Sequence, residues 1–266
     1  MPGILSTAFL FALLCAAAAV GYVVKSRLPE RHRSRDSFEL VQLSINLLVT
    51  FTAIVLGLLT NSVKNGFDAA YSERGAYAAS LVQLDHCLRD YGPETAAMQE
   101  QLQSYTAAVI ASTWPDEPPP QGVSYPNTAG MPLTGESRTL AAILDRVGSE
   151  LRQFEPSDPL HQRLQTSCLE LYRDMERSRW RVIEQARASI SQPFYWVLML
   201  WLVILFASIG LTAPPSPVTV IVVVLSVTSI VSAVFVIQDL DMPYGGLFGI
   251  PSTSMRQALA DMRAPP

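Results

Sequence analysis

The sequence predicts an all-α membrane protein in which two pairs of transmembrane helices flank a soluble helical insert. Two observations lead to this fold class. Apolar residues make up 49% of the 266 residues and charged residues only 16%, well below the roughly 25% of charged residues in an average soluble chain. The charges are also missing from long stretches: residues 4–24, 40–63 and 188–238 contain no Asp, Glu, Lys, Arg or His.

Each of these stretches matches the length of a membrane crossing. A helix needs about 20 apolar residues to cross about 30 Å of hydrocarbon, so the first two stretches fit one crossing each. The third is long enough for two, and the Pro-rich segment 213–217 divides it because proline cannot continue a helix interior. The expected spans are therefore residues 4–24, 40–60, 194–212 and 217–237.

The first span could also be read as a cleaved signal peptide. A signal peptide has a basic region before its apolar run, whereas only Met1 to Gly3 precede this one. The run is also longer than the usual apolar core of a signal peptide. We therefore expect a retained membrane anchor, so that residues 1–60 hold the first two spans and a basic connecting loop.

Residues 61–192 are expected to form the soluble insert. Apolar residues recur at helical spacing beyond the second span, which predicts that its helix continues to Tyr91. Gly92-Pro93 ends this helix and starts another that reaches about Trp114. The Pro- and Gly-rich residues 115–137 predict an irregular loop.

The remainder of the insert is also expected to be helical. One helix is predicted near residues 138–154, and a second begins at Asp158, which suits an N-cap, and Pro159, which suits the first turn. Residues 193–238 then hold the third and fourth spans, and residues 239–266 form a tail with a short amphipathic helix from Ser252 to Met262.

The distribution of Lys and Arg leaves the membrane orientation open. The first connecting loop holds five of them, Lys25, Arg27, Arg31, Arg33 and Arg35. Short loops count most in the positive-inside rule, so these residues favour a cytoplasmic first loop and an external insert. The opposite face holds nine: Lys64, Arg74, Arg173, Arg177, Arg179, Arg181, Arg187, Arg256 and Arg263. The total therefore favours a cytoplasmic insert.

The second span carries a stripe of small and polar residues. At about 100° per residue, one helix face collects Gln42, Asn46, Thr50, Ala53, Gly57, Thr60 and Lys64. Polar groups that face lipid are costly, so this face must contact protein or water. Helix packing through the Ala53/Gly57 pair explains the stripe slightly better than a pore wall does. A pore lined by small, weakly polar side chains with Lys64 at its mouth would suit anions.

The sequence contains no motif that indicates an enzyme, a cofactor or a metal site. A Gly-rich phosphate loop, GxSxG, HExxH and a Cys/His nucleophile pairing are all missing. Adjacent Glu73 and Arg74 are expected to be solvated, as most neighbouring charges on a helix surface are. The three cysteines predict no disulfide framework. A net charge of −4 gives no support for nucleic-acid binding.

Three segments resemble the bacterial DUF4239 family, which is described as bestrophin-like. They are LPERHRSRDSFELVQLSINLLVTFTAIVLGLLTNSVKNGFD, LDHCLRDYGPET, and the C-terminal run from SRWRVIEQARASISQPFYWV to DLDMPYGGLFGIPSTSMRQAL. The resemblance spans nearly the whole chain, with the Pro-rich loop as its most divergent part. It implies a multi-pass protein of the bacterial inner (cytoplasmic) membrane.

The relation to bestrophins carries further expectations. Bestrophins are pentameric anion channels with four spans per subunit, and their second helix lines the pore. The run from Asn65 to Arg74 is similar in spacing to the bestrophin segment NNAAYDRWWEAR, although its tryptophan pair is absent. This register places the bestrophin neck at Ala53, Gly57 and Asn61, which are smaller than the bulky apolar residues of that neck. The resemblance also implies a cytoplasmic insert.

We therefore expect a homo-oligomeric channel in the lipid bilayer, a pentamer if it is bestrophin-like, that conducts anions. Its pore-lining candidates are Asn46, Thr50, Ala53, Gly57, Thr60, Asn61 and Lys64. The alternative is a non-conducting scaffold or sensor whose insert binds a partner and whose arginine-rich helix before the third span holds anionic lipid. A secondary transporter is a third possibility, although no inverted repeat is visible.

Overall fold

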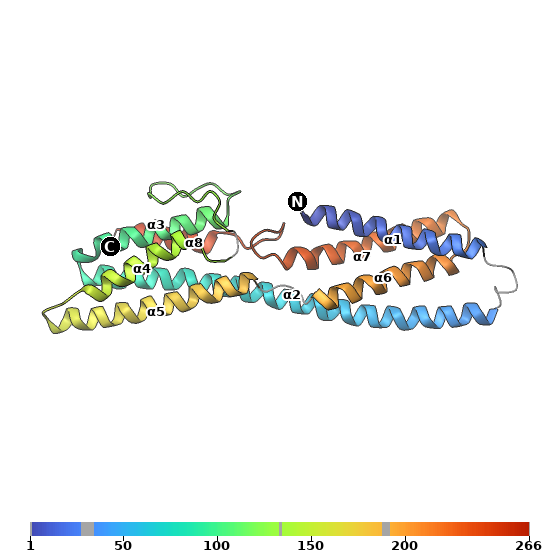
Figure 1. The fold of residues 1–266 in the computed structure, drawn as a ribbon, viewed down its shortest axis with the longest axis horizontal. Coiled ribbons are helices and arrows are strands. Elements are labelled where there is room, and N and C mark those ends of the chain that lie inside the picture. The colour runs from blue at the N-terminus through green and yellow to red at the C-terminus, as the bar shows by residue number, and fades with distance from the viewer. Residues whose placement is uncertain (1, 28–34, 133–134, 188–191, 266) are drawn as a thin grey trace. The chain divides into compact units, whose positions relative to one another are not determined.

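The computed structural model describes residues 2–27, 35–132, 135–187 and 192–265. Within these ranges all regular secondary structure is helical (Figure 1). The elements are α1 (Pro2–Arg27), α2 (Arg35–Tyr91), the short 3₁₀ helix η2 (Pro93–Thr95), α3 (Ala96–Thr113), α4 (Arg138–Gln153), α5 (Pro159–Arg187), α6 (Gln192–Thr212), α7 (Pro217–Leu240) and α8 (Thr253–Arg263).

Four helices in the described ranges, α1, α2, α6 and α7, are long and apolar enough to cross a membrane. The predicted all-α fold with four spans is thus confirmed. The helix starts also follow the expected chemistry: Asp158 Oδ1 accepts hydrogen bonds from the backbone N–H groups of Leu160, at 2.9 Å, and His161, at 3.0 Å. The junction between α5 and α6 lies outside the described residues.

The chain divides into two compact units. A membrane unit comprises Met1–Asn65 and Ser189–Met242, and a soluble unit comprises Gly66–Ala188 and Pro243–Pro266. Helix α2 is continuous through residue 65 and contributes to both units. The sequence division assigned residues 239–266 to a separate tail, whereas the structure groups most of that segment with the insert.

In the membrane unit α1 packs against α6 and α7 (Figure 1). Two glycines bring the backbones of α1 and α6 into direct contact. A Cβ added to Gly21 would lie 1.9 Å from the carbonyl oxygen of Ala207, and one added to Gly210 would lie 2.0 Å from that of Ala18. Close approach at small residues is a common way for helices to associate in lipid. The α1–α6 contact therefore depends on the absence of side chains at both positions.

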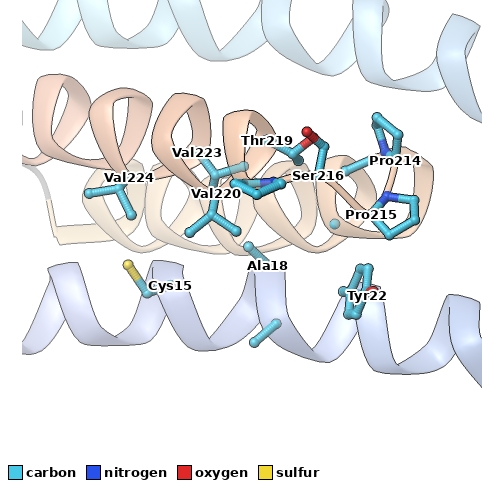
Figure 2. A pocket seen from close by; sticks show the side chains of 14 residues that line it. Cys15, Ala18, Tyr22, Pro214, Pro215, Ser216, Thr219, Val220, Val223 and Val224 are labelled. Atoms are coloured by element: carbon cyan, nitrogen blue, oxygen red, sulfur yellow. The ribbon is translucent and has the colours of Figure 1, made fainter.

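An apolar groove opens beside this contact, between α1 and the start of α7 (Figure 2). It has a volume of about 590 Å³, and its lining includes Cys15, Ala18, Val220 and Val224. Ser216, at its polar end, uses its hydroxyl as the N-cap of α7, where it accepts a hydrogen bond from the N–H of Val218. The groove therefore fits hydrocarbon better than an ion.

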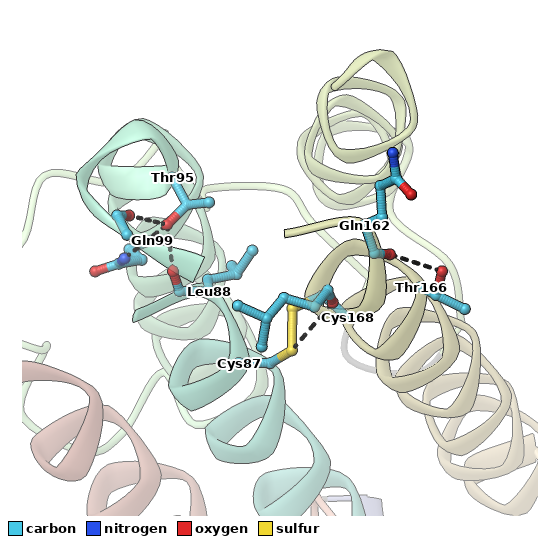
Figure 3. The surroundings of a disulfide bond; sticks show 9 residues. Cys87, Leu88, Thr95, Gln99, Gln162, Thr166 and Cys168 are labelled. Carbon is cyan, nitrogen blue, oxygen red and sulfur yellow. Dashed lines mark hydrogen bonds between the residues drawn. A yellow bond between two sulfur atoms is a disulfide. The ribbon is translucent and has the colours of Figure 1, made fainter. Parts of the chain in front are cut away.

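A disulfide joins two helices of the soluble unit. Cys87 on α2 and Cys168 on α5 are bonded with a Cα–Cα distance of 5.6 Å (Figure 3). Both cysteines belong to the hydrophobic core of that unit. The expectation that the cysteines form no framework is therefore wrong. Their separation of 81 residues gives no local spacing from which the pairing could be predicted.

The glycine contact predicts a contrast between two matched substitutions. Gly210→Ala places a methyl group against the backbone of α1, so we expect a loss of about 1–3 kcal/mol of stability. Gly57→Ala is the control, because an added Cβ there meets nothing within 4 Å, and the gain in helix propensity is up to about 1 kcal/mol. The midpoint of thermal unfolding in detergent measures both, and equal midpoints would contradict the close contact.

Candidate functional site on helix α2

One face of the α2 span packs on the other helices of the membrane unit. Ile45, Thr52, Leu59 and Val63 are buried on this face, with exposures of 6–8%. Leu59 belongs to the same hydrophobic core as Leu198 and Leu202 of α6. Because these positions share one side of the helix, they fix the direction in which every other residue of the span points.

The stripe lies about a third of a turn away from the buried face, at about 100° per residue. The predicted pore-lining residues are all exposed in the protomer, six of them on the stripe and Asn61 at its edge: Asn46, Thr50, Ala53, Gly57, Thr60, Asn61 and Lys64. No atom lies within 4 Å of a Cβ added at Gly57. Ala53 and Gly57 are therefore exposed in the protomer, and the packing interpretation would need another copy of the chain to contact them.

A third face of the span is apolar and also exposed. It carries Leu40, Leu43, Leu47, Ile54 and Leu58. These side chains are between 53% and 67% exposed, so none of them is buried against the described part of the protomer. The span thus presents one face to its own protomer, one polar face, and one apolar face suited to lipid or to another apolar surface.

Hydrogen bonds within α2 already use some of the polar groups of the stripe, and this limits which groups could bond to water or to an ion. The hydroxyl of Thr50 donates to the carbonyl oxygen of Asn46 at 2.9 Å, and that of Thr60 donates to the carbonyl oxygen of Leu56 at 2.7 Å. Both hydroxyl hydrogens are thereby used inside the helix. The amides of Gln42 and Asn46 also lie on this face, where Gln42 donates to Asn46 Oδ1 at 3.3 Å. The amide of Asn61 lies at the edge of the face, and Lys64 places a positive charge at its end.

The charged pair Glu73-Arg74 differs from its sequence interpretation. Arg74 is only 4% exposed, and Glu73 lies 3.3 Å from the guanidinium of Arg181 on α5. Helical periodicity could have indicated the burial, because Arg74 lies four and seven residues before the buried Ala78 and Leu81. The prediction that this pair is solvated is therefore wrong for Arg74.

Comparisons with known proteins agree with this architecture. The model of the bestrophin-like domain matches residues 12–255. No curated protein matches the chain. Two crystal structures of variants of a bacterial bestrophin homologue from Klebsiella pneumoniae resemble it, each with a TM-score of 0.65. The first is 15% identical and the match covers 97% of this chain and 96% of that one; the second is 14% identical, with coverage of 96% and 97%.

At this level of identity the solved structures establish a shared fold. The family model extends from the first span into α8. It covers the four spans, the insert and most of the tail, which is far more than half of the chain. The chain therefore belongs to the bestrophin-like family.

Proposed function

We propose that the protein is a homo-oligomeric channel in which the polar face of α2 from each copy lines a shared pore for anions. The observation that carries the proposal is the exposure of this face on a membrane-crossing helix. Family membership supports a bestrophin-type channel, and the resemblance makes a pentamer the expected assembly.

The physical argument starts from the cost of polar groups in hydrocarbon. Amide and hydroxyl groups on the exposed face of a span need protein or water as a partner. Copies arranged around an axis meet this need, because each α2 then directs its polar face to a central aqueous path. The apolar face with Leu43, Leu47 and Leu58 is left for a neighbouring copy or for lipid.

The charge of the same face favours anions. Between residues 40 and 63 the span carries no charged residue, and Lys64 follows directly. A ring of ammonium groups at the mouth of a pore attracts anions and repels cations. The amides of Asn46 and Asn61 can donate hydrogen bonds to an anion that has lost part of its hydration shell.

The alternative, a scaffold or sensor that holds anionic lipid through the arginines of α5, has less support in the structure. Arg177 pairs with Asp174 at 2.7 Å, Arg179 with Glu136 at 3.2 Å and Arg181 with Glu73 at 3.3 Å. Three of the five arginines that precede the third span are thus paired with carboxylates of the soluble unit. Chloride flux through liposomes that contain the purified protein separates the two functions, because a scaffold leaves the vesicles silent.

Gly57→Phe tests whether this face lines the path. A Cβ added at Gly57 meets no atom of the described residues within 4 Å, so the protomer has open space at this position. In the proposed assembly, several rings would converge on the axis. We expect chloride flux to fall by about tenfold or more, since closing an apolar constriction removes its water. Leu58→Phe is the matched control on the apolar face and should retain flux. Equal flux in both variants would contradict the assignment.

Lys64→Glu tests the charge at the mouth. Reversing one charge per copy should lower the chloride-to-sodium permeability ratio by about fivefold or more. A fivefold change corresponds to about 1 kcal/mol, the interaction energy of two unit charges about 4 Å apart in water. Arg177→Glu reverses a charge that is 73% exposed on α5 and should leave the ratio unchanged. Reversal potentials in a salt gradient measure both variants, and an unchanged ratio in Lys64→Glu would count against anion selection there.

The disulfide bears on the side of the membrane that the insert occupies. Structural disulfides persist in oxidising compartments and are rare in the reducing cytosol. The five basic residues of the first loop favour the same arrangement, because short loops count most in the positive-inside rule, although the nine on the opposite face outnumber them. We therefore infer that the first loop is cytoplasmic and the insert external, the reverse of the orientation that the resemblance implies.

Two single-cysteine reporters test this orientation. Ser124 lies in the insert and Ser26 at the end of α1 that leads into the first loop, and both are exposed. In a Cys15→Ser background, a membrane-impermeant maleimide applied to intact spheroplasts should label the Ser124→Cys variant and spare the Ser26→Cys variant. As a control, the same maleimide should label both variants once the cells are permeabilised, because both cysteines are then accessible. The opposite labelling pattern would place the insert in the cytoplasm.

A further inference from the structure

A small cavity in the soluble unit is surrounded by cationic and hydroxyl-bearing side chains. Helix α2 contributes Arg74 and Tyr77, α3 contributes Tyr105, α5 contributes Arg179, and the C-terminal segment contributes Tyr244. Its volume is about 70 Å³, several times the space that one ordered water requires. Its lining includes two arginines and no aspartate or glutamate.

Arg74 is a buried cation without a carboxylate partner in the part of the chain that the structure describes. Its guanidinium carbon lies 4.9 Å from the ring centroid of Trp114 and 4.5 Å from that of Tyr244. These cation–π contacts stabilise the charge in part. Its Nε nevertheless has no hydrogen-bond acceptor among the described residues, which is an unusual state for a group with 4% exposure.

The hydroxyl of Tyr244 also lacks a hydrogen-bond partner among the described residues. It is buried, although Tyr244 lines the cavity with Arg74. Two unsatisfied donors at one cavity require an acceptor, and burying both without one would be costly. An anion would satisfy both groups at once.

The other polar groups of the lining do not supply that acceptor. The hydroxyls of Tyr77 and Tyr105 lie 2.5 Å apart and bond to each other. Burial raises the pKa of Tyr105 above its ordinary value, so its hydroxyl stays protonated at neutral pH. Arg179 is paired with Glu136, which is 35% exposed and lies outside the lining. The cavity thus combines excess positive charge with unused donors.

We propose that this cavity binds a small monovalent anion, a halide or a carboxylate of the size of formate, between the guanidinium of Arg74 and the hydroxyl of Tyr244. Arg179 adds positive charge to the site. The volume excludes nucleotides and lipid headgroups. The proposal does not rest on conduction, because every residue of the site belongs to the soluble unit.

The test is thermal unfolding of the purified full-length protein in detergent, with sodium gluconate replaced stepwise by sodium bromide at constant ionic strength. A ligand that binds only the folded state raises the unfolding midpoint in a saturable way. We expect a rise of about 3 °C or more in the wild type. A second series with sodium formate distinguishes a carboxylate site from a halide site.

Three variants identify the site. Tyr244→Phe keeps the ring over Arg74 but removes the hydroxyl, so the bromide concentration at half-maximal shift should increase about tenfold, the effect of one lost hydrogen bond. Arg74→Gln should abolish the shift. Arg177→Gln removes an exposed charge of the same unit and should respond as the wild type does.

Two results would overturn the proposal. One is a wild-type unfolding midpoint whose rise does not level off with increasing bromide or formate, because a general salt effect does not saturate. The other is a half-maximal concentration in Tyr244→Phe equal to that of the wild type, a comparison that remains valid if Arg74→Gln does not fold. Liposomes that pass no chloride would refute the channel but would leave these measurements unaffected.

Discussion

A polar group that faces hydrocarbon has no partner for its hydrogen bonds, and this constraint decides how α2 can be placed in a membrane. One side of the span is fixed by Ile45, Leu59 and their neighbours against the rest of the membrane unit. The stripe with Asn46 and Asn61 consequently points away from the protomer. In a single copy the amide oxygen of Asn46 accepts from Gln42 at 3.3 Å, but the amide N–H groups of Asn46 and Asn61 would face lipid, whereas an assembly with a common polar axis would hydrate them. The proposed assembly would thus supply the hydrogen-bond partners that this helix face needs.

The soluble unit is held together by contacts between segments that are distant in the sequence. Besides the disulfide, the indole N–H of Trp114 donates to the carbonyl oxygen of Ile250 at 2.7 Å. Arg256 of α8 bonds to Glu117 at 3.1 Å, and Ser252 bonds to the same carboxylate. The C-terminal segment is therefore part of the core of this unit, and it brings Tyr244 to the cavity beside Arg74.

Sequence reasoning succeeded where the physical cause is local. Missing charges marked the spans, Asp158 and Pro159 marked a helix start, and a period of 3.6 residues grouped the stripe on one face. It failed where the cause is tertiary. The Cys87–Cys168 bond joins residues 81 positions apart, and the burial of Arg74 depends on rings supplied by α3 and by the C-terminal segment. The resemblance indicated the family but could not show which side chains are exposed.

The two smallest residues of the polar face have a kinetic consequence. Gly57 has no side chain and Ala53 has only a methyl group, so neither residue can widen or narrow a passage by changing rotamer. Rotamer changes take picoseconds to nanoseconds, whereas displacements of whole helices take microseconds to milliseconds. A passage bounded by these two residues would therefore change its width only as fast as α2 itself can roll or tilt, and its openings would be correspondingly slow and discrete.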